Sequence, residues 1–543
     1  MYKRTLILFG LMMSLFCFSF FSLDLISNKN NFKDAASNQQ SYKLRISDIR
    51  GTIYDCRNVP LVNIEKKLVA AVIPSVEALS ALTPAVPECK KEELFKKCSG
   101  NTPFMIEIEK EVRSPWIKVF EVPIRYSGVT LAPHIIGYIS GDKKGISGIE
   151  KVFDEYLSGK NQNICIKYDV DASGKILPGG QSIVEDKSYF TSKGVVLNID
   201  SRIQAIAEEC AAKQMSRGAV VVTQVPNCEV RACVSLPSFS PKDVSKYLSD
   251  KNSPLLNRSF CSFNLGSIFK LVTSAAALKK GVSSDLSYDC QGINEVDDAK
   301  FKCFNCKKHG LINMQDAIAY SCNGYFIELI KNKINKDDLL KMAGKFGLGK
   351  EIIFADGIVS REGKLPASES LEDIKTLANF SFGQGKLLAT PMQISALINA
   401  IASEGIYTPP KLVKGLAAEN MKFSPYDAHS ELKRTEKIIS PGIALKLKEF
   451  MKASVDYGTG KKGKPEDPET EVAAKTSTAQ TGIIEDGKRI EQSWFAGFFP
   501  YDKPKYSIVV LSEAGAGGGE SAGPIFKEIV ERIYKEVPEI FMD

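Results

Sequence analysis

The stretch "FNLGSIFKLV", residues 263–272, places Ser267 three residues ahead of Lys270 at the expected start of an amphipathic helix. Residues three apart on a helix share a face, so the hydroxyl and the amine can meet. Taken alone, the pattern is typical of a helix N-terminus with a solvated lysine. The same spacing recurs at Ser140–Lys143 and Ser430–Lys433, where polar surroundings indicate solvated loops. Whether Ser267 and Lys270 are catalytic therefore depends on the rest of the chain.

Two further polar motifs follow Ser267 along the chain. The first is Ser-x-Asn in "AIAYSCNGYF", formed by Ser321 and Asn323. The second is Lys-Thr-x in "VAAKTSTAQTG", which comprises Lys475, Thr476, Ser477 and Thr478. The order Ser-x-x-Lys, Ser-x-Asn, Lys-Thr-x is a catalytic signature of serine acyl-transferring enzymes. It favours a nucleophile and its base over a core helix.

The residue types fit acyl transfer without histidine. The chain has only three histidines, which argues against a Ser-His-Asp enzyme or a site with several histidine ligands. A serine nucleophile needs a base, and a desolvated lysine near other cations can be neutral and accept a proton. Lys270 suits that role, Ser321 can relay the proton to a leaving amine, and Asn323 can hold a substrate amide.

The third motif supplies groups that would bind an anionic substrate. We expect Lys475 to hold the relay serine and to provide positive field for a substrate carboxylate. The hydroxyls of Thr476 and Thr478 can hydrogen-bond to that carboxylate. The backbone N–H groups of Ser267 and Thr478 are expected to form an oxyanion hole.

With these motifs and their flanks, the chain resembles the class B penicillin-binding proteins, the monofunctional peptidoglycan D,D-transpeptidases. The flanking matches lie in family order: "RGTIYDCRNVPLV", "HIIGYIS…GISGIEKVFDEYLSG", "GKILPGG", "VLNIDSRIQAIAEE", "KHGLINMQDAIAYSCNGYF" and "FGQGKLLATPMQISALINAIASEG". The resemblance implies that Ser267 forms an acyl-enzyme with a D-alanyl-D-alanine stem peptide, releases D-alanine and reacts with β-lactams. It implies no metal and no organic cofactor.

The chain departs from the family pattern at four positions. Ser477 replaces the glycine of Lys-Thr-Gly, on a strand that the substrate backbone approaches closely, so substrate fit or β-lactam affinity is expected to differ. Ala474 stands where glycine is common. Cys56 replaces arginine and Val59 replaces glycine in the early motif, which indicates a different turn at Asn58.

Local patterns predict an antiparallel sheet covered by helices, an α+β fold or α/β sandwich. The resemblance implies that this is a penicillin-binding transpeptidase domain with a serine β-lactamase-like fold. Residues 217–237 read as a hairpin, 493–500 and 505–514 as paired strands, and 523–537 as a closing helix. Long helices are expected over roughly 310–455. Residues 132–160 read as strand, turn and helix, and the helix after residue 200 has Asp200 or Ser201 as its N-cap.

The N-terminus carries a membrane signal. Lys3 and Arg4 precede an uncharged run from Thr5 to Leu23, roughly 28 Å long as a helix. We expect an uncleaved signal anchor with a cytoplasmic N-terminus and the bulk outside, and a cleaved signal peptide is the alternative. The expected divisions are a tip (1–4), an anchor (5–26), a stalk (27–44), a β-rich pedestal of the dimerisation type (45–205) and a transpeptidase domain (206–543).

The 13 cysteines leave one cluster open to interpretation. Cys290, Cys303, Cys306 and His309 have a spacing that could hold zinc, remain as thiols or include a disulfide. An exported protein would favour the disulfide, and our expectation is that no metal is bound. Cys322, inside Ser-x-Asn, reads as a small apolar filler.

The expected partners are peptidoglycan stem peptides and β-lactams. The chain shows no glycosyltransferase module, so the family implies a membrane-embedded glycan polymerase as a partner, with a dimer or a cell-wall assembly complex possible. Its net charge of +7 comes without a basic block and favours no nucleic acid. Three alternatives stay open: a D,D-carboxypeptidase, a β-lactam-sensing or -hydrolysing relative, and an inert cell-wall scaffold. The growth stage and the acceptor amine also stay open.

Overall fold

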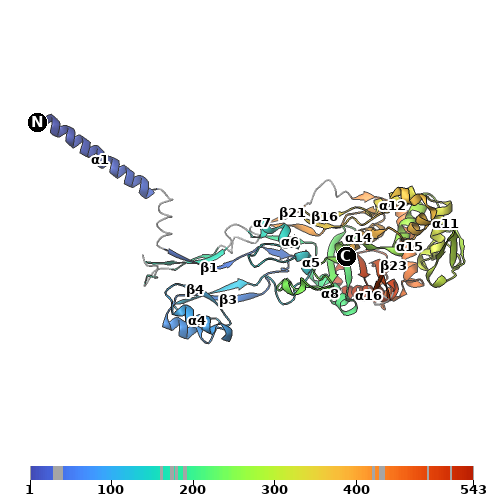
Figure 1. Cartoon of the computed structure of the whole chain (residues 1–543), viewed down its shortest axis with the longest axis horizontal. Coiled ribbons are helices and arrows are strands. Elements are labelled where there is room, and N and C mark those ends of the chain that lie inside the picture. The colour runs from blue at the N-terminus through green and yellow to red at the C-terminus, as the bar shows by residue number, and fades with distance from the viewer. Residues whose placement is uncertain are drawn as a thin grey trace. The chain divides into compact units, whose positions relative to one another are not determined.

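The computed structural model divides the chain into two compact units that interleave in the sequence (Figure 1). It describes residues 2–28, 41–158, 163–171, 176–177, 182–186, 193–418, 422–426, 435–485, 488–513 and 517–541. The first unit comprises Met1–Arg50, Asn63–Arg125 and Ser158–Thr191, and the second comprises Gly51–Val62, Tyr126–Leu157 and Ser192–Asp543. The expected boundary at 205/206 stays a prediction. Three segments of the expected pedestal, residues 51–62, 126–157 and 192–205, belong to the second unit.

The apolar N-terminal run forms one long helix, α1 (Tyr2–Asn28). Tyr2–Asp24 is long and apolar enough to cross a membrane, and none of it is buried by the protein. Its large side chains are exposed, Phe9 at 68% for example. A helix without a protein partner needs another apolar surrounding, and its length matches a bilayer. The helix fits a single-pass membrane anchor. Most of the expected stalk lies outside the described residues, and β1 begins at Ser41.

The first unit is rich in strands. One sheet has the order β1-β6-β7 and another the order β4-β3-β5, with neighbouring strands antiparallel. The elements are β1 (Ser41–Asp48), β3 (Lys66–Val72), α3 (Val76–Leu82), α4 (Lys91–Cys98), β4 (Phe104–Ile108), β5 (Ile117–Pro123), β6 (Asn163–Asp169) and β7 (Ile183–Asp186). Val69 and Ala71 of β3 pack with Ile164 and Ile166 of β6, while Ala70 and Val72 face the helices. This alternation is that of a strand between two layers.

The second unit is built on a five-stranded antiparallel sheet in the order β10-β9-β25-β24-β23. The strands are β9 (Gly218–Gln224), β10 (Glu229–Leu236), β23 (Ala473–Glu485), β24 (Lys488–Phe499) and β25 (Tyr506–Ser512). Ile508 and Val510 of β25 face a layer that contains α8 (Ser201–Gln214) and α16 (Gly523–Glu536). Val509 and Leu511 face the opposite layer, which contains α9 (Phe269–Lys279) and α14 (Pro391–Ala402). The expected sandwich of helices around an antiparallel sheet is confirmed.

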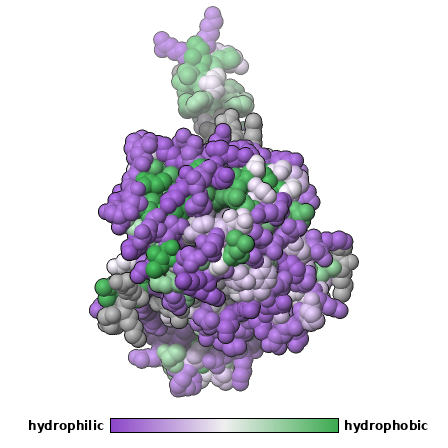
Figure 2. Space-filling view, turned by 90° about the vertical axis from the view of Figure 1, so that its right-hand side faces the viewer, coloured by the Kyte–Doolittle hydropathy of each residue, from purple (hydrophilic) through white to green (hydrophobic). Residues whose placement is uncertain are grey.

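The region from 310 to 455 contains helices separated by short strands. The helices are α10 (Met314–Ala319), α11 (Asn323–Asn332), α12 (Lys336–Lys345), α13 (Ile374–Ser381), α14 and α15 (Pro441–Asp456). Strand pairs β16 (Ile352–Ala355) with β17 (Ile358–Ser360), and β20 (Val413–Ala417) with β21 (Phe423–Pro425), interrupt them. Seen from the side that carries α11, the surface is mainly hydrophilic with scattered apolar patches (Figure 2).

One local prediction was wrong. The expected strand at 132–139 begins as a short helix, α5 (Pro133–Ile136), because Pro133 occupies the first helical turn, where its missing N–H costs nothing. Gly137, at φ +81°, ends it. The helix expected next is broken at Phe153 into α6 (Gly148–Val152) and α7 (Asp154–Ser158).

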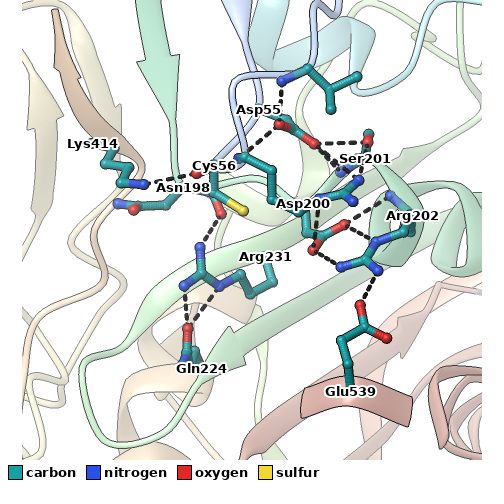
Figure 3. A network of polar contacts seen from close by, with 12 residues as sticks. Asp55, Cys56, Asn198, Asp200, Ser201, Arg202, Gln224, Arg231, Lys414 and Glu539 are labelled. Carbon is teal, nitrogen blue, oxygen red and sulfur yellow. Dashed lines mark hydrogen bonds and ion pairs between the residues drawn. The ribbon is translucent and has the colours of Figure 1, made fainter. Parts of the chain in front are cut away.

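A polar network explains why Gly51–Val62 belongs to the second unit (Figure 3). Asp55 accepts hydrogen bonds from Ser201 Oγ at 2.8 Å and from the N–H groups of Arg57 and Val59, both at 2.8 Å. Lys414 Nζ donates to the Cys56 carbonyl at 2.8 Å. The buried Asp55 therefore closes the turn, with Asn58 at φ +64°, and ties it to the N-terminus of α8.

The same network continues at the start of α8. Asp200 is its N-cap, because its carboxylate accepts the Arg202 N–H at 3.0 Å. The Arg202 guanidinium bonds to Asp200 and Glu539, which connects α8 to the C-terminal segment. Beside these residues, β2 (Thr52–Tyr54) pairs in parallel with β8 (Gly194–Leu197).

Candidate active site

Ser267 lies in the 3₁₀ turn η5 (Gly266–Ile268), which leads directly into α9. Gly266 adopts φ +65°, and its N–H donates to the Gly383 carbonyl at 2.9 Å. A Cβ on Gly266 would come within 2.3 Å of Ser477 Oγ. Both the backbone angle and the contact require glycine here. The turn is thus held from two sides, which fixes the position of Ser267.

The amine of Lys270 contacts polar groups from both of the first two motifs. Its Nζ lies 3.0 Å from Ser267 Oγ, 3.0 Å from Ser321 Oγ, 2.7 Å from the Ser321 carbonyl and 2.7 Å from Asn323 Oδ1. The side chain is fully buried, on the first turn of α9. The lysine can exchange a proton with either serine.

Burial lowers the pKa of Lys270 to about 8, from an ordinary value of 10.5. Desolvation disfavours the ammonium form, and among the described residues no carboxylate lies within hydrogen-bond reach to stabilise it. A neutral amine is therefore accessible near physiological pH, as a general base requires.

Ser321 and Asn323 lie at the junction between α10 and α11. Ser321 has φ +58°, in the left-handed region that few non-glycine residues adopt. Its Oγ donates to Ser267 Oγ at 2.9 Å. Asn323 starts α11, and its Nδ2 donates to the Lys302 carbonyl at 2.8 Å. Two serines and a lysine therefore form a closed triangle of hydrogen bonds.

The third motif lies on β23, which packs beside η5. Lys475 is fully buried, and burial together with the charge of Lys270 lowers its pKa well below the ordinary value. Its Nζ donates to the Thr476 carbonyl at 3.0 Å, whereas the sequence suggested the Ser321 hydroxyl as its partner. The structure thus brings Lys475 within electrostatic range of Lys270, with a different hydrogen-bond partner.

The residues after Lys475 alternate between two faces of β23. Thr476 Oγ1 and Thr459 Oγ1 are hydrogen-bonded at 2.7 Å. Ser477 Oγ donates to the Leu265 carbonyl at 2.6 Å, and the residue is only 2% exposed. The Ser477 hydroxyl therefore contacts the loop ahead of Ser267. Thr478 is half-buried, and a Cβ on the nearby Gly517 would lie 3.9 Å from its Oγ1.

We expect Ser477→Ala to destabilise the protein by about 1 kcal/mol, because it leaves the buried Leu265 carbonyl without its hydroxyl donor. Urea unfolding of the full chain would measure the change. Ser454→Ala is the matched control, since Ser454 is also buried but its Oγ has no partner among the described residues. Equal losses in the two variants would contradict a role for the Ser477–Leu265 bond.

The Ser140–Lys143 pair does not form a comparable group. Lys143, at φ +61°, donates its backbone N–H to the Ser140 carbonyl in an exposed turn. Ser430 and Lys433 lie outside the described residues, as does most of "GKILPGG".

The model of the penicillin binding protein transpeptidase domain matches residues 218–531, more than half of the chain. The chain belongs to the class B penicillin-binding proteins. The resemblance inferred from the motifs is thereby confirmed.

Several relatives of this family cover most of the chain. Stage V sporulation protein D of Bacillus subtilis is 28% identical over 474 residues, 83% of this chain and 70% of that protein. Peptidoglycan D,D-transpeptidase FtsI of Escherichia coli is 26% identical over 508 residues, 89% of this chain and 79% of that protein.

Solved structures in the family share the fold. Penicillin-binding protein 2 of Helicobacter pylori, in complex with MreC, has a TM-score of 0.66 at 22% identity, covering 91% of this chain and 99% of that one. Penicillin binding protein 3 of Mycobacterium tuberculosis with aztreonam has a TM-score of 0.64 at 21% identity, covering 92% and 97%.

Sequence reasoning missed three contributors to the site. Thr459 bonds to Thr476, Gly383 anchors the turn before Ser267, and Cys322 faces away from Ser267 into a cluster described below. The paired glycines of "FGQG" signalled a turn but not its partner. No local signal identifies Thr459, because its contact joins the turn after α15 to β23.

Proposed function

We propose that this protein is a peptidoglycan D,D-transpeptidase that cross-links stem peptides through an acyl-enzyme on Ser267. The observation that carries the proposal is the triangle formed by the partly buried Ser267 and Ser321 and the fully buried Lys270, with Lys270 Nζ 3.0 Å from both hydroxyls. The names of the relatives, several of them peptidoglycan D,D-transpeptidases, support it.

Acylation starts with proton transfer inside this triangle. Neutral Lys270 takes the proton of Ser267 Oγ as the oxygen attacks the carbonyl carbon of the penultimate D-alanine. The proton then passes through Ser321 to the amide nitrogen, the C–N bond breaks, and D-alanine leaves as a free amine. The products are an ester on Ser267 and a neutral Lys270, so protons and electrons balance.

Substrate binding is assigned to β23 and to backbone donors. The N–H groups of Ser267 and Thr478 stabilise the oxyanion of the tetrahedral intermediate. The Thr476 and Thr478 hydroxyls bind the terminal carboxylate, in the positive field of Lys475. Asn323 holds a substrate amide through its side chain.

The second half-reaction decides between cross-linking and hydrolysis. In a transpeptidase, the amine of a neighbouring stem peptide attacks the ester and gives a proton to Lys270. Lys270 passes that proton to Ser267 Oγ as the ester C–O bond breaks, which restores the free serine and the neutral lysine. In a carboxypeptidase, water takes the place of that amine. Comparing cross-linked with trimmed products from a disaccharide-pentapeptide substrate distinguishes the two.

The apolar helix α1 and the basic residues before it support a proposed membrane arrangement. We assign Lys3 and Arg4 to the cytoplasmic side and the folded units to the outside of the cell. Residues 45–205 are assigned to a pedestal and 206–543 to the transpeptidase domain. Residues 51–62, 126–157 and 192–205 fall within the assigned pedestal but pack as part of the second unit. A membrane-embedded glycan polymerase is the proposed partner, and the protein acts within a dimer or a cell-wall assembly complex.

Benzylpenicillin tests the proposal directly. The full chain in detergent is incubated with the drug, digested and mapped by mass spectrometry. We expect a stable adduct on the peptide that contains Ser267. An adduct elsewhere contradicts the assignment, the lack of any adduct on folded protein favours the inert scaffold, and rapid hydrolysis of the adduct favours a β-lactam-hydrolysing relative.

A further inference from the structure

Four potential metal ligands converge behind the active site. They are Cys290 at the end of β12 (Tyr288–Cys290), Cys303 after β14 (Ala299–Lys302), His309 before β15 (Gly310–Ile312) and Cys322 at the N-cap of α11. Their ligand atoms all lie within 4.8 Å of one another. The three cysteines are buried and His309 is half-buried. Side chains from four separate segments of the chain therefore lie close enough together to bind one ion.

The distances fit the edges of a tetrahedron around one metal ion. The Sγ···Sγ separations are 3.8 Å for Cys290–Cys303, 3.8 Å for Cys303–Cys322 and 3.4 Å for Cys290–Cys322. Cys290 Sγ lies 3.3 Å from His309 Nδ1. Zinc–sulfur bonds of about 2.3 Å at tetrahedral angles give edges of about 3.8 Å between sulfurs.

The same geometry argues against a disulfide. A disulfide requires sulfurs about 2.0 Å apart, and none of the three pairs is singled out by a short distance. Pairing any two would also leave the third thiol buried beside His309. In the described part of the chain, all 13 cysteines are free thiols.

The structure corrects the ligand set suggested by the sequence. Cys306 is exposed, on the turn between Cys303 and His309, and is not part of the cluster. Cys322, read from the sequence as an apolar filler, takes its place. The turn at Ser321 directs its side chain away from Ser267.

We propose that Cys290, Cys303, His309 and Cys322 bind a structural zinc ion beside the active site. Three thiolates and one imidazole are a ligand set that zinc favours, and four protein ligands close its coordination sphere. The expectation that no metal is bound is thereby replaced by a proposal from the geometry.

The surroundings of the four ligands suit an anionic zinc–thiolate centre. Backbone N–H groups of Gly292 and His309 lie near Cys290, and those of Asn323 and Gly324 lie near Cys303. The His309 N–H donates to the Cys290 carbonyl at 3.2 Å. Backbone dipoles this close offset the net charge of −1 that one Zn²⁺ and three thiolates carry. The His309 ring stacks on Tyr320 with centroids 5.9 Å apart and an angle of 5° between planes, which fixes its orientation.

The zinc ion would hold the Ser-x-Asn motif through Cys322. Ser321, at φ +58°, and Asn323 both contact Lys270, and Cys322 lies between them. A left-handed serine persists only where its surroundings enforce it, and a metal–thiolate bond on the next residue does so. This consequence rests on the proposed function, whereas the metal site itself does not.

Metal content tests the site independently of catalysis. Full-length protein, purified in detergent without chelator, is analysed for zinc by mass spectrometry, and we expect about one ion per chain. Cys303→Ser and His309→Ala should each lower that content by at least roughly tenfold. Cys306→Ser, an exposed cysteine on the same turn, is the matched control and should retain the full amount. Cobalt substitution should give the visible bands of tetrahedral thiolate-bound Co²⁺.

Several outcomes overturn the proposal. They are wild-type protein without zinc, equal zinc in the ligand variants and Cys306→Ser, and a disulfide among the three cysteines found by alkylation under denaturing conditions. Should a variant fail to fold, the cobalt spectrum of the wild-type chain still decides, since octahedral bands contradict a closed sulfur-rich site.

The effect on catalysis is measured separately. Chelation that removes zinc from the wild-type chain should slow penicillin acylation roughly 10- to 100-fold, and added zinc should restore the rate. Unchanged acylation after zinc loss rejects the positioning role while leaving the metal site intact. No acylation even of the zinc-loaded protein counts against the proposed function instead.

Discussion

Ser267→Ala is expected to abolish covalent labelling by benzylpenicillin, a loss of at least roughly 10⁴-fold in the acylation rate. Alanine has no oxygen to form the ester, and the other hydroxyl of the triangle, Ser321, is placed to relay a proton. Gel fluorescence with a labelled penicillin measures the effect. The fold should survive, because Ser267 is only partly buried and alanine is tolerated in a helical turn.

Ser274→Ala provides the matched control for this loss. Ser274 lies on α9, the helix that follows Ser267, and is buried, yet its Oγ has no hydrogen-bond partner among the described residues. Labelling should equal that of the wild type. Strong residual labelling of Ser267→Ala, or loss of labelling in Ser274→Ala, would contradict the assignment of the nucleophile.

Lys270→Met is expected to slow acylation by roughly 10²–10⁴-fold, the usual contribution of a general base. Methionine has a similar volume and needs no hydrogen bonds, so the helix should keep its packing. Stopped-flow or quenched labelling gives the rate constant, and thermal unfolding verifies the fold. Lys279→Met, an exposed lysine on the same helix, should acylate at the wild-type rate. A loss in both variants points to a general effect of the substitution.

The pH profile separates a base from a merely positioning lysine. Because burial lowers the pKa of Lys270 to about 8, the amine is increasingly protonated below that pH and cannot accept the Ser267 proton. The acylation rate of the wild type should therefore rise with pH and level off above about 8. The profile of Lys270→Met should be flat over the same range. A wild-type rate independent of pH from 6 to 9 would exclude Lys270 as the base.

Local sequence patterns were sufficient for the sheet and its covering helices. The hairpin at 217–237 and the closing helix at 523–537 follow from apolar alternation and helical periodicity, and both are present. The patterns gave the wrong structure where a single proline or a contact with a distant residue determines the local conformation. Pro133 turned an expected strand into α5, and Gly51–Val62 joined the second unit through Asp55 and Ser201, which are 146 residues apart. Contacts at that separation leave no periodic trace.

The active site shows the same difference between features that local patterns predict and features that they do not. Motif order brought together the residues of the hydrogen-bonded triangle, because each motif has its own fixed local geometry. The directions of Ser477 and Cys322 could not be read in this way. Ser477 faces the Leu265 carbonyl because of the register of β23 beside η5, and Cys322 faces the sulfur cluster because Ser321 is left-handed. Both depend on backbone angles that residue type alone does not set.

The early position of β2 also has a consequence for the order of folding. During synthesis, β2 emerges long before its partner β8, and the Cys56 carbonyl bonds to a lysine 358 residues later. Contacts of such sequence separation close slowly. The first strand of the second unit must therefore wait until most of the chain has been synthesised. A polypeptide that stalls before Lys414 leaves this strand incompletely paired and open to association with neighbouring chains.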